Sequence, residues 1–110
     1  DGFGFEQFDY LFTATYESYG VAVQAFLTGR PTPGEAVALA AAYSEFLIDN
    51  GAVFQETNVS VPGALLYNLF GTYELVFSAG QFVAGVHEAD SPEAAERMAA
   101  ELYHRITRNR

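Results

Sequence analysis

The chain has 110 residues, enough for one domain with a sizeable core, and half of them are hydrophobic, which excludes a disordered polypeptide. Fourteen acidic residues against five arginines and no lysine give a net charge of −9, which disfavours nucleic-acid backbones and anionic membranes as partners. The absence of cysteine excludes disulfides and thiolate chemistry, and no apolar run approaches the roughly 20 residues that a membrane span needs.

The first nine residues form a predicted N-terminal aromatic arm, followed by a single α+β domain over residues 10–110. Glycines at positions 2 and 4 make the arm pliable, while Phe3 and Phe5 would point the same way in an extended strand. Two interpretations stay open. The arm lies over its own core, or it adds a strand to the sheet edge of a neighbour.

The start and composition of the chain also bear on its origin. The sequence begins at Asp1 without methionine, as expected of an exported protein after removal of its leader or of a piece of a longer chain. Missing lysine with many alanines is typical of a GC-rich bacterial coding sequence. An exported bacterial protein is the favoured interpretation.

The middle of the chain alternates short apolar-polar segments with turn residues, the pattern of β-hairpins. Gly80, for example, can take the positive φ of a tight reversal between two such segments. Strands are predicted at residues 10–16, 21–27, 52–59, 73–77 and 82–87, and residues 64–70 form either a sixth strand or a short helical turn.

Two helices are predicted, over residues 33–50 and 92–107, and each opens with a capping residue followed by proline. Thr32 and Ser91 suit the N-cap position, and Glu35 completes a capping box with Thr32. Four of the five arginines lie in the second helix and the tail after it, where cations complement the helix dipole.

The order of these elements predicts an α+β fold with an antiparallel sheet of five to six strands built from hairpins. Both helices are expected to pack on one face of that sheet. The segments 10–50 and 73–107 share the order strand, strand, helix. They represent either an internal ββα repeat or the ordinary succession of a hairpin and a helix.

The sequence lacks the short motifs of common active sites. It has no glycine-rich phosphate loop and no Gly-x-Ser-x-Gly elbow. His87, Glu88, Asp90, Glu101 and His104 could supply metal ligands, but a solvent-facing role is more typical of each histidine. We therefore expect neither a cofactor nor catalytic residues, and a non-enzyme is the favoured interpretation.

Seven tyrosines and ten phenylalanines are the marked excess in the composition. If two helices cover one sheet face, the other face would expose aromatic side chains that need a partner. The first hypothesis is a non-catalytic assembly module that binds a copy of itself or a neighbouring domain through this face or the arm. Its candidate residues are Phe3, Phe5, Phe12, Tyr16, Phe26 and Phe70.

The alternative hypothesis is a pocket between sheet and helices that binds a small apolar ligand or substrate. A curved sheet packed against helices can enclose such a cavity, with a few polar groups at its rim. The candidate pocket residues are Tyr67, Tyr73, Glu74 and His87.

Overall fold

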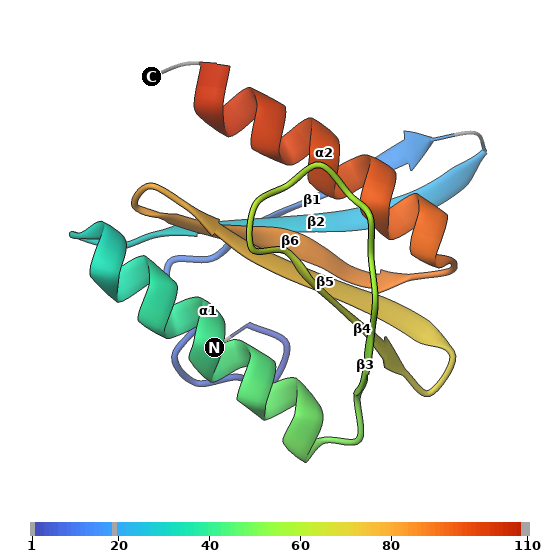
Figure 1. The fold of residues 1–110 in the computed structure, drawn as a ribbon, viewed down its shortest axis with the longest axis horizontal. Helices are drawn as coiled ribbons and strands as arrows, with labels where there is room; N and C mark the ends of the chain where they lie inside the picture. The colour runs from blue at the N-terminus through green and yellow to red at the C-terminus, as the bar shows by residue number, and fades with distance from the viewer. Residues whose placement is uncertain (1, 19, 109–110) are drawn as a thin grey trace.

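The computed structural model describes residues 2–18 and 20–108, which form one six-stranded sheet and two helices (Figure 1). In chain order the elements are β1 (Phe12–Ser18), β2 (Val21–Gly29), α1 (Pro33–Asp49), β3 (Val53–Gln55), β4 (Leu65–Leu69), β5 (Thr72–Ala79), β6 (Phe82–Ala89) and α2 (Pro92–Arg108). The strands lie in the order β1-β2-β6-β5-β4-β3 and every neighbouring pair is antiparallel. The predicted α+β fold with an antiparallel, hairpin-built sheet is confirmed.

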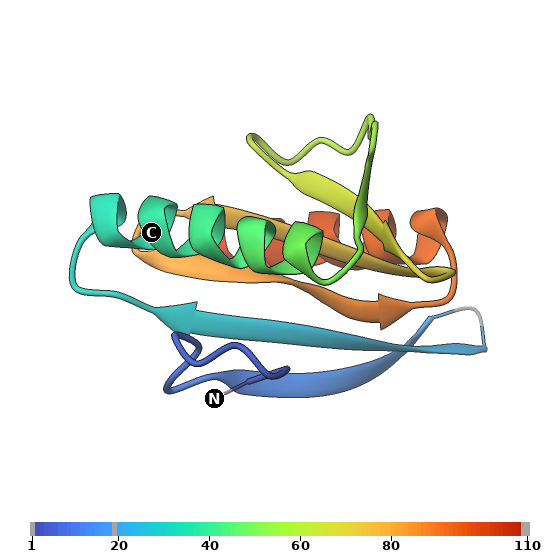
Figure 2. The same ribbon diagram turned by 90° about the horizontal axis from the view of Figure 1, so that it is seen from below.

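The two helices lie on opposite faces of the sheet, so the expectation that both cover one face is wrong (Figure 2). Both helices contact the central strands β5 and β6. Leu75 and Phe77 pack in the core under α2, whereas Val76, between them, packs in the core under α1. Successive residues of a strand point to opposite faces. Because Leu75, Val76 and Phe77 are all apolar, each face of β5 has to be covered by a helix.

Each face therefore has its own hydrophobic core. We call the side under α2 the α2 face and the side under α1 the α1 face. The α2 face is formed mainly by Val23, Ala25, Leu66, Leu75, Phe77, Ala84, Val86, Ala95, Met98, Ala99 and Leu102. The α1 face is formed by Phe5, Phe8, Phe26, Ala36, Leu39, Tyr43, Leu47, Ala52, Tyr67, Val76 and Val83. Burying one large apolar side chain contributes roughly 1.5–3 kcal/mol, so neither core is dispensable.

The local helix signals act as the sequence indicates. The Thr32 hydroxyl accepts a hydrogen bond from the backbone N–H of Glu35 at 3.1 Å, and the Ser91 hydroxyl accepts one from Ala94 at 3.1 Å. Gly51 follows the C-cap of α1 with a φ of 104°. These contacts satisfy backbone groups that would otherwise lack partners at the helix ends.

The region between α1 and β5 differs in part from expectation. Residues 64–70 include a strand, β4, whereas the strand predicted at 52–59 shortens to the three residues of β3. Beyond β3 the chain crosses to the α2 face, where Val61 is buried. The Thr57 hydroxyl there donates a hydrogen bond to the Glu96 carboxylate at 2.6 Å. Tertiary packing on α2 thus replaces strand pairing in this segment.

Gly85 on β6 lies close to the backbone of β5 and to Phe26, and it gives a test of the packing. A Cβ at this position would lie 1.9 Å from the Leu75 carbonyl oxygen and 2.8 Å from the Phe26 ring. Gly85→Ala should therefore lower the free energy of unfolding by about 3 kcal/mol, measured by urea denaturation. The control is Gly34→Ala in the first turn of α1, where the nearest atom is 4.0 Å away. It should be neutral or stabilising by about 0.5 kcal/mol. Equal effects of the two substitutions would contradict the packing described for β6.

Candidate functional site

A fully buried carboxylate, that of Glu74, lies on the α1 face of the sheet. It sits where the pairing of β5 with β6 shifts register, between Tyr73 and Leu75. The Tyr43 hydroxyl donates to Oε1 at 3.2 Å, and His87 Nδ1 lies 2.9 Å from the same oxygen. The backbone N–H of Glu88 donates to Oε2 at 2.9 Å. Both carboxylate oxygens thus have partners, as a charge taken out of water requires.

His87 connects this carboxylate to the N-terminal arm. The Phe3 ring stacks on the imidazole, with 3.9 Å between ring centres and 20° between planes. The side chain of His87 is 18% exposed, and its Nε2 lies 3.7 Å from the exposed Glu88 carboxylate. A carboxylate that orients an imidazole is also found in acid–base sites. In this chain, however, a ring of the protein itself covers one face of the imidazole.

Tyr43 is the member of this cluster that sequence reasoning did not single out. It lies in the middle of α1 with 1% of its surface exposed. Burial above all, and then the neighbouring Glu74 carboxylate, raises the pKa of Tyr43 far above its ordinary value. The signal in the sequence is a tyrosine on the buried face of an alanine-rich helix, because a buried hydroxyl needs a hydrogen-bond partner.

The four predicted pocket residues do not share one location. Glu74 and His87 are in contact, and Tyr67 pairs with Glu74 across β4 and β5 on the α1 face. Tyr73 packs on the opposite α2 face, where its hydroxyl accepts a hydrogen bond from the Asn68 side-chain amide at 3.3 Å. The three residues on the α1 face, Tyr67, Glu74 and His87, contact other residues of the protein.

The raised pKa of Tyr43 makes stability fall at alkaline pH. The unfolded chain loses the phenol proton near pH 10 while the folded chain keeps it, so above about pH 10 unfolding becomes easier, by up to about 1.4 kcal/mol per pH unit. Tyr43→Phe should be about 1 kcal/mol less stable than the parent at pH 7, through loss of the bond to Glu74. This difference should shrink or reverse by pH 11.

Urea unfolding at pH 7, 9, 10 and 11 measures this effect. Tyr10→Phe is the matched control, because that ring is 84% exposed. Tyr10→Phe should show the same pH dependence of the free energy of unfolding as the parent. A constant stability gap between Tyr43→Phe and the parent across this range would contradict the assignment.

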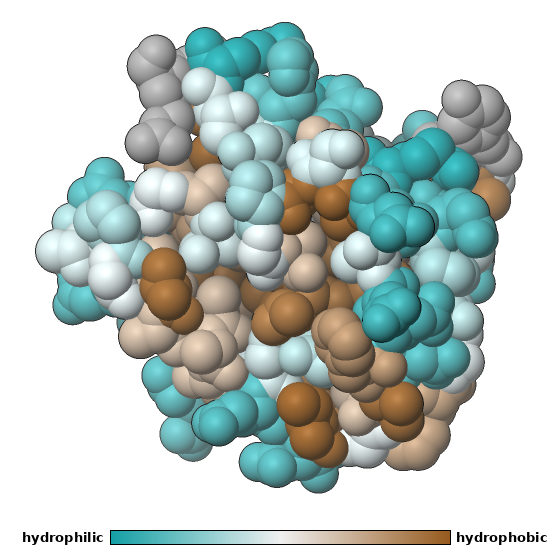
Figure 3. Space-filling view, in the orientation of Figure 1, coloured by the Kyte–Doolittle hydropathy of each residue, from teal (hydrophilic) through white to brown (hydrophobic). Residues whose placement is uncertain are grey.

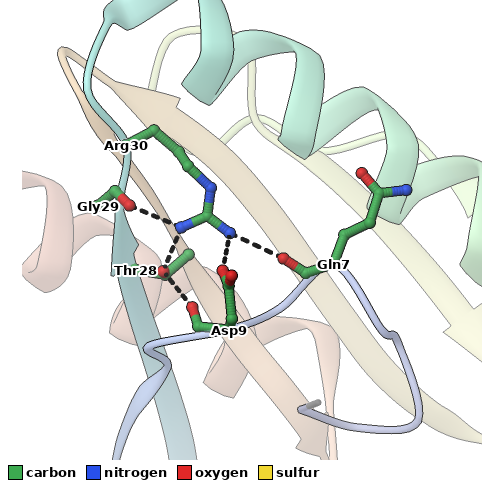
Figure 4. Close-up of polar contacts among 5 residues, drawn as sticks. All are labelled: Gln7, Asp9, Thr28, Gly29 and Arg30. Atoms are coloured by element: carbon green, nitrogen blue, oxygen red, sulfur yellow. Dashed lines mark hydrogen bonds and ion pairs between the residues drawn. The ribbon is translucent and has the colours of Figure 1, made fainter.

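The N-terminal arm packs on its own domain. Phe5 and Phe8 are buried in the core of the α1 face. Arg30, at the end of β2, holds the segment after them (Figure 4): its Nη2 donates to the Gln7 carbonyl and to the Asp9 carboxylate, each at 2.8 Å. The fully buried Thr28 hydroxyl donates to the Asp9 carbonyl at 3.0 Å. The described part of the arm is therefore packed into the fold and held there by hydrogen bonds.

Removal of the Arg30 guanidinium should loosen this segment. Arg30→Met keeps an aliphatic stem but loses charge-assisted hydrogen bonds, so unfolding should become easier by about 1–3 kcal/mol. Amide hydrogen exchange at Phe5 and Phe8, whose N–H groups bond within the arm, should accelerate more than exchange in β5. Arg108→Met at the exposed end of α2 is the control. Unchanged exchange in the arm of Arg30→Met would show that the aromatic rings alone hold it.

The six predicted interaction residues do not form one surface, and the uncovered aromatic sheet face is a wrong prediction. Phe5 and Phe26 are buried under α1, and Phe3 is half-buried against His87. Phe70 is 85% exposed in the turn between β4 and β5. Phe12 and Tyr16 lie on β1 at the other edge of the sheet. The reason is the second helix, because α1 and the arm cover the face that was expected to be bare.

β1 is the long edge strand of the sheet, and within residues 2–18 and 20–108 no strand pairs with its outer side (Figure 2). All seven of its residues pair with β2 in unbroken register. Residues 12–15 and Glu17 are exposed, and Phe12 is 71% exposed. The strand contains no lysine and no proline, and its pairing has no bulge. Lysine, proline and bulges commonly keep an edge strand from pairing with another chain, and β1 has none of the three.

A groove of about 720 Å³ runs beside β1 on the α2 face. Tyr16 and Glu17 form one side of it, and Arg97, Met98 and Arg105 are among the α2 residues of the other. The Arg105 guanidinium lies 5.4 Å from the centre of the Tyr16 ring, in cation–π geometry. α2 packs over β2, β5 and β6, so the α2 face of β1 is only flanked by the helix.

Comparison with known proteins adds no assignment: no protein-family model, no curated protein and no solved structure matches the chain. Within residues 2–18 and 20–108, no three His, Asp or Glu side chains gather in a way that could hold a metal ion. Neither of the helices described is long and apolar enough to cross a membrane. The geometry of the site alone therefore carries the functional argument.

Proposed function

We propose that this chain is a non-catalytic assembly module that extends its sheet by strand addition at the open edge of β1. The observation that carries the proposal is a seven-residue edge strand without lysine, proline or a bulge, on which Phe12 is 71% exposed. An edge strand presents a row of unpaired N–H and C=O groups, and an added strand satisfies them. Side chains at alternate positions then give the pairing its specificity.

The distribution of charge favours this edge over the rest of the surface. The chain carries a net charge of −9, which opposes association of like molecules in general. β1 has Glu17 as its one charged residue, and in the groove beside it the carboxylates of Glu17 and Glu101 are balanced by Arg97 and Arg105. Two chains that meet along β1 therefore bring together a part of the molecule whose formal charges balance, although the chain as a whole is strongly acidic.

The opposite edge of the sheet is a weaker candidate. β3 has three residues and β1 has seven, so β3 offers fewer backbone groups for hydrogen bonds to an added strand. Ile48, Val53, Phe54 and Phe70 are exposed around that edge. Figure 3 shows hydrophobic side chains in the corresponding lower region, near the end of α1 and the β4–β5 turn. The β3 edge therefore serves as a control for the proposal, because it is a second exposed apolar surface of the same molecule.

Binding of a small apolar ligand, or an enzyme built on such a pocket, is the less supported function. The Glu74 carboxylate would be the natural anchor for a ligand on the α1 face, but it is fully buried and bonded to Tyr43, His87 and the Glu88 backbone. The groove beside β1 is open and lined largely by charged side chains. Apolar ligands are usually held in sites that bury most of their surface.

A lysine placed on β1 tests the proposal. Thr15→Lys changes an exposed position, so the stability of the fold should stay within about 0.5 kcal/mol of the parent. It should abolish association at the edge, because paired strands would bring like charges together. Light scattering with size-exclusion chromatography, over a wide range of protein concentration, should show the parent increasing in mass and Thr15→Lys remaining monomeric.

Val53→Lys on β3 is the matched control, with the same added charge at the opposite edge, where Val53 is 66% exposed. It should associate like the parent. A parent that stays monomeric, or a Val53→Lys variant that loses association as fully as Thr15→Lys, would contradict the assignment to β1.

A further inference from the structure

We propose that the strand added at β1 is the β1 strand of a second copy, paired antiparallel about a two-fold axis that passes beside Ala14. This inference rests on the proposed strand addition and names its partner and register. The sequence Phe12-Thr13-Ala14-Thr15-Tyr16 is nearly symmetric about its central residue. In an antiparallel pair of identical strands, that symmetry places similar side chains opposite one another.

The pairs formed in this register are favourable on both faces. Phe12 of each copy lies opposite Tyr16 of the other on the α2 face, and Thr13 lies opposite Thr15 on the α1 face. Aromatic pairs and threonine pairs across antiparallel strands each contribute roughly 0.2–1 kcal/mol, and symmetry makes each of them twice. The two alanines at the axis leave room for the strands to approach.

Neighbouring registers are less favourable. A two-fold axis at Thr15 would place Phe12 opposite Ser18 and Ala14 opposite Tyr16, so both aromatic pairs are lost. An axis at Thr13 would place Phe12 opposite Ala14, so both aromatic pairs are lost, and it would place Glu17 opposite position 9, which lies outside β1. The axis at Ala14 places Glu17 opposite Leu11 instead, and it opposes no two like charges.

The position of α2 fits the same arrangement. A two-fold axis perpendicular to the sheet keeps the α2 helices of both copies on one side of the joined sheet. The strip of Phe12, Ala14 and Tyr16 then forms the floor between the two helices. Phe12 of the second copy would lie beside Tyr16, whose ring already contacts Arg105 at the edge of the groove. A ring that is 71% exposed in one copy would thereby gain cover.

Such an interface is isologous, so it closes at two copies. Each chain uses its own β1 edge once, and both β3 edges remain at the far ends of a joined twelve-stranded sheet, twice the six strands of one copy. The arrangement therefore predicts a dimer, whereas pairing of β1 with β3 would continue into a filament.

A single engineered cysteine tests the register, because the chain has no cysteine of its own. In the proposed pair the two Cα atoms of residue 14 are about 4.5–5.5 Å apart, within reach of a disulfide. The Cα atoms of residue 15 in the two copies are diagonal neighbours, about 7–8 Å apart and outside that reach. Under mild oxidation, Ala14→Cys should form a covalent dimer in high yield, and Thr15→Cys should form little.

Phe12→Ser provides a second readout that does not depend on oxidation. Loss of both aromatic pairs should weaken dimerisation by about tenfold in sedimentation velocity, with the fold retained. A Phe12→Ser variant that dimerises like the parent would overturn the inference.

The outcomes separate this inference from the proposed function. A parent dimer in which Thr15→Cys crosslinks as well as Ala14→Cys, or in which neither crosslinks, overturns the register and leaves strand association standing. A parent chain that stays monomeric at every concentration overturns both. Rapid crosslinking of Ala14→Cys alone, in a dimer that Thr15→Lys abolishes, supports both.

Discussion

Burial of the β5–β6 hairpin on both of its faces is the constraint on which the rest of the architecture depends. Leu75, Val76 and Phe77 follow one another with at most 1% of each exposed. A strand of this kind cannot border water on either side, so each face takes one helix. Two helices then suffice for the centre of the sheet but not for its margins. The arm completes the cover of the α1 face, and β1 remains open along its outer side.

Among the buried residues described, Glu74 is the one with a carboxylate, and it lies within this largely apolar centre. Its three partners come from α1, from β6 and from the backbone of β6, so the group ties the helix to the hairpin. His87 extends the connection to Phe3 in the arm. A buried charge is a poor source of net stability, but its directional bonds admit few alternative arrangements. We regard the cluster as the feature that sets how the arm, α1 and the sheet fit together.

The sequence predicts the features that depend on local signals. The caps at Thr32 and Ser91, the reversal at Gly80 and the antiparallel hairpins all follow from neighbouring residues. The placement of the helices does not, because an apolar run such as β5 does not show which face each helix will cover. Glu74 and His87 were singled out by type, but their common partner Tyr43 depends on the helix position and on a register shift in the sheet.

The concentration of basic residues on α2 has a consequence for proteolysis. Arg30 is the one arginine before position 97 in a chain without lysine, and it precedes proline, a bond that trypsin does not cleave. The other arginines lie on α2 or directly after it. Trypsin can therefore cut this chain only in its final helix and the tail. The rate of digestion would measure local opening of α2 from the α2 face of the sheet. The arm, α1 and all six strands would remain in one fragment.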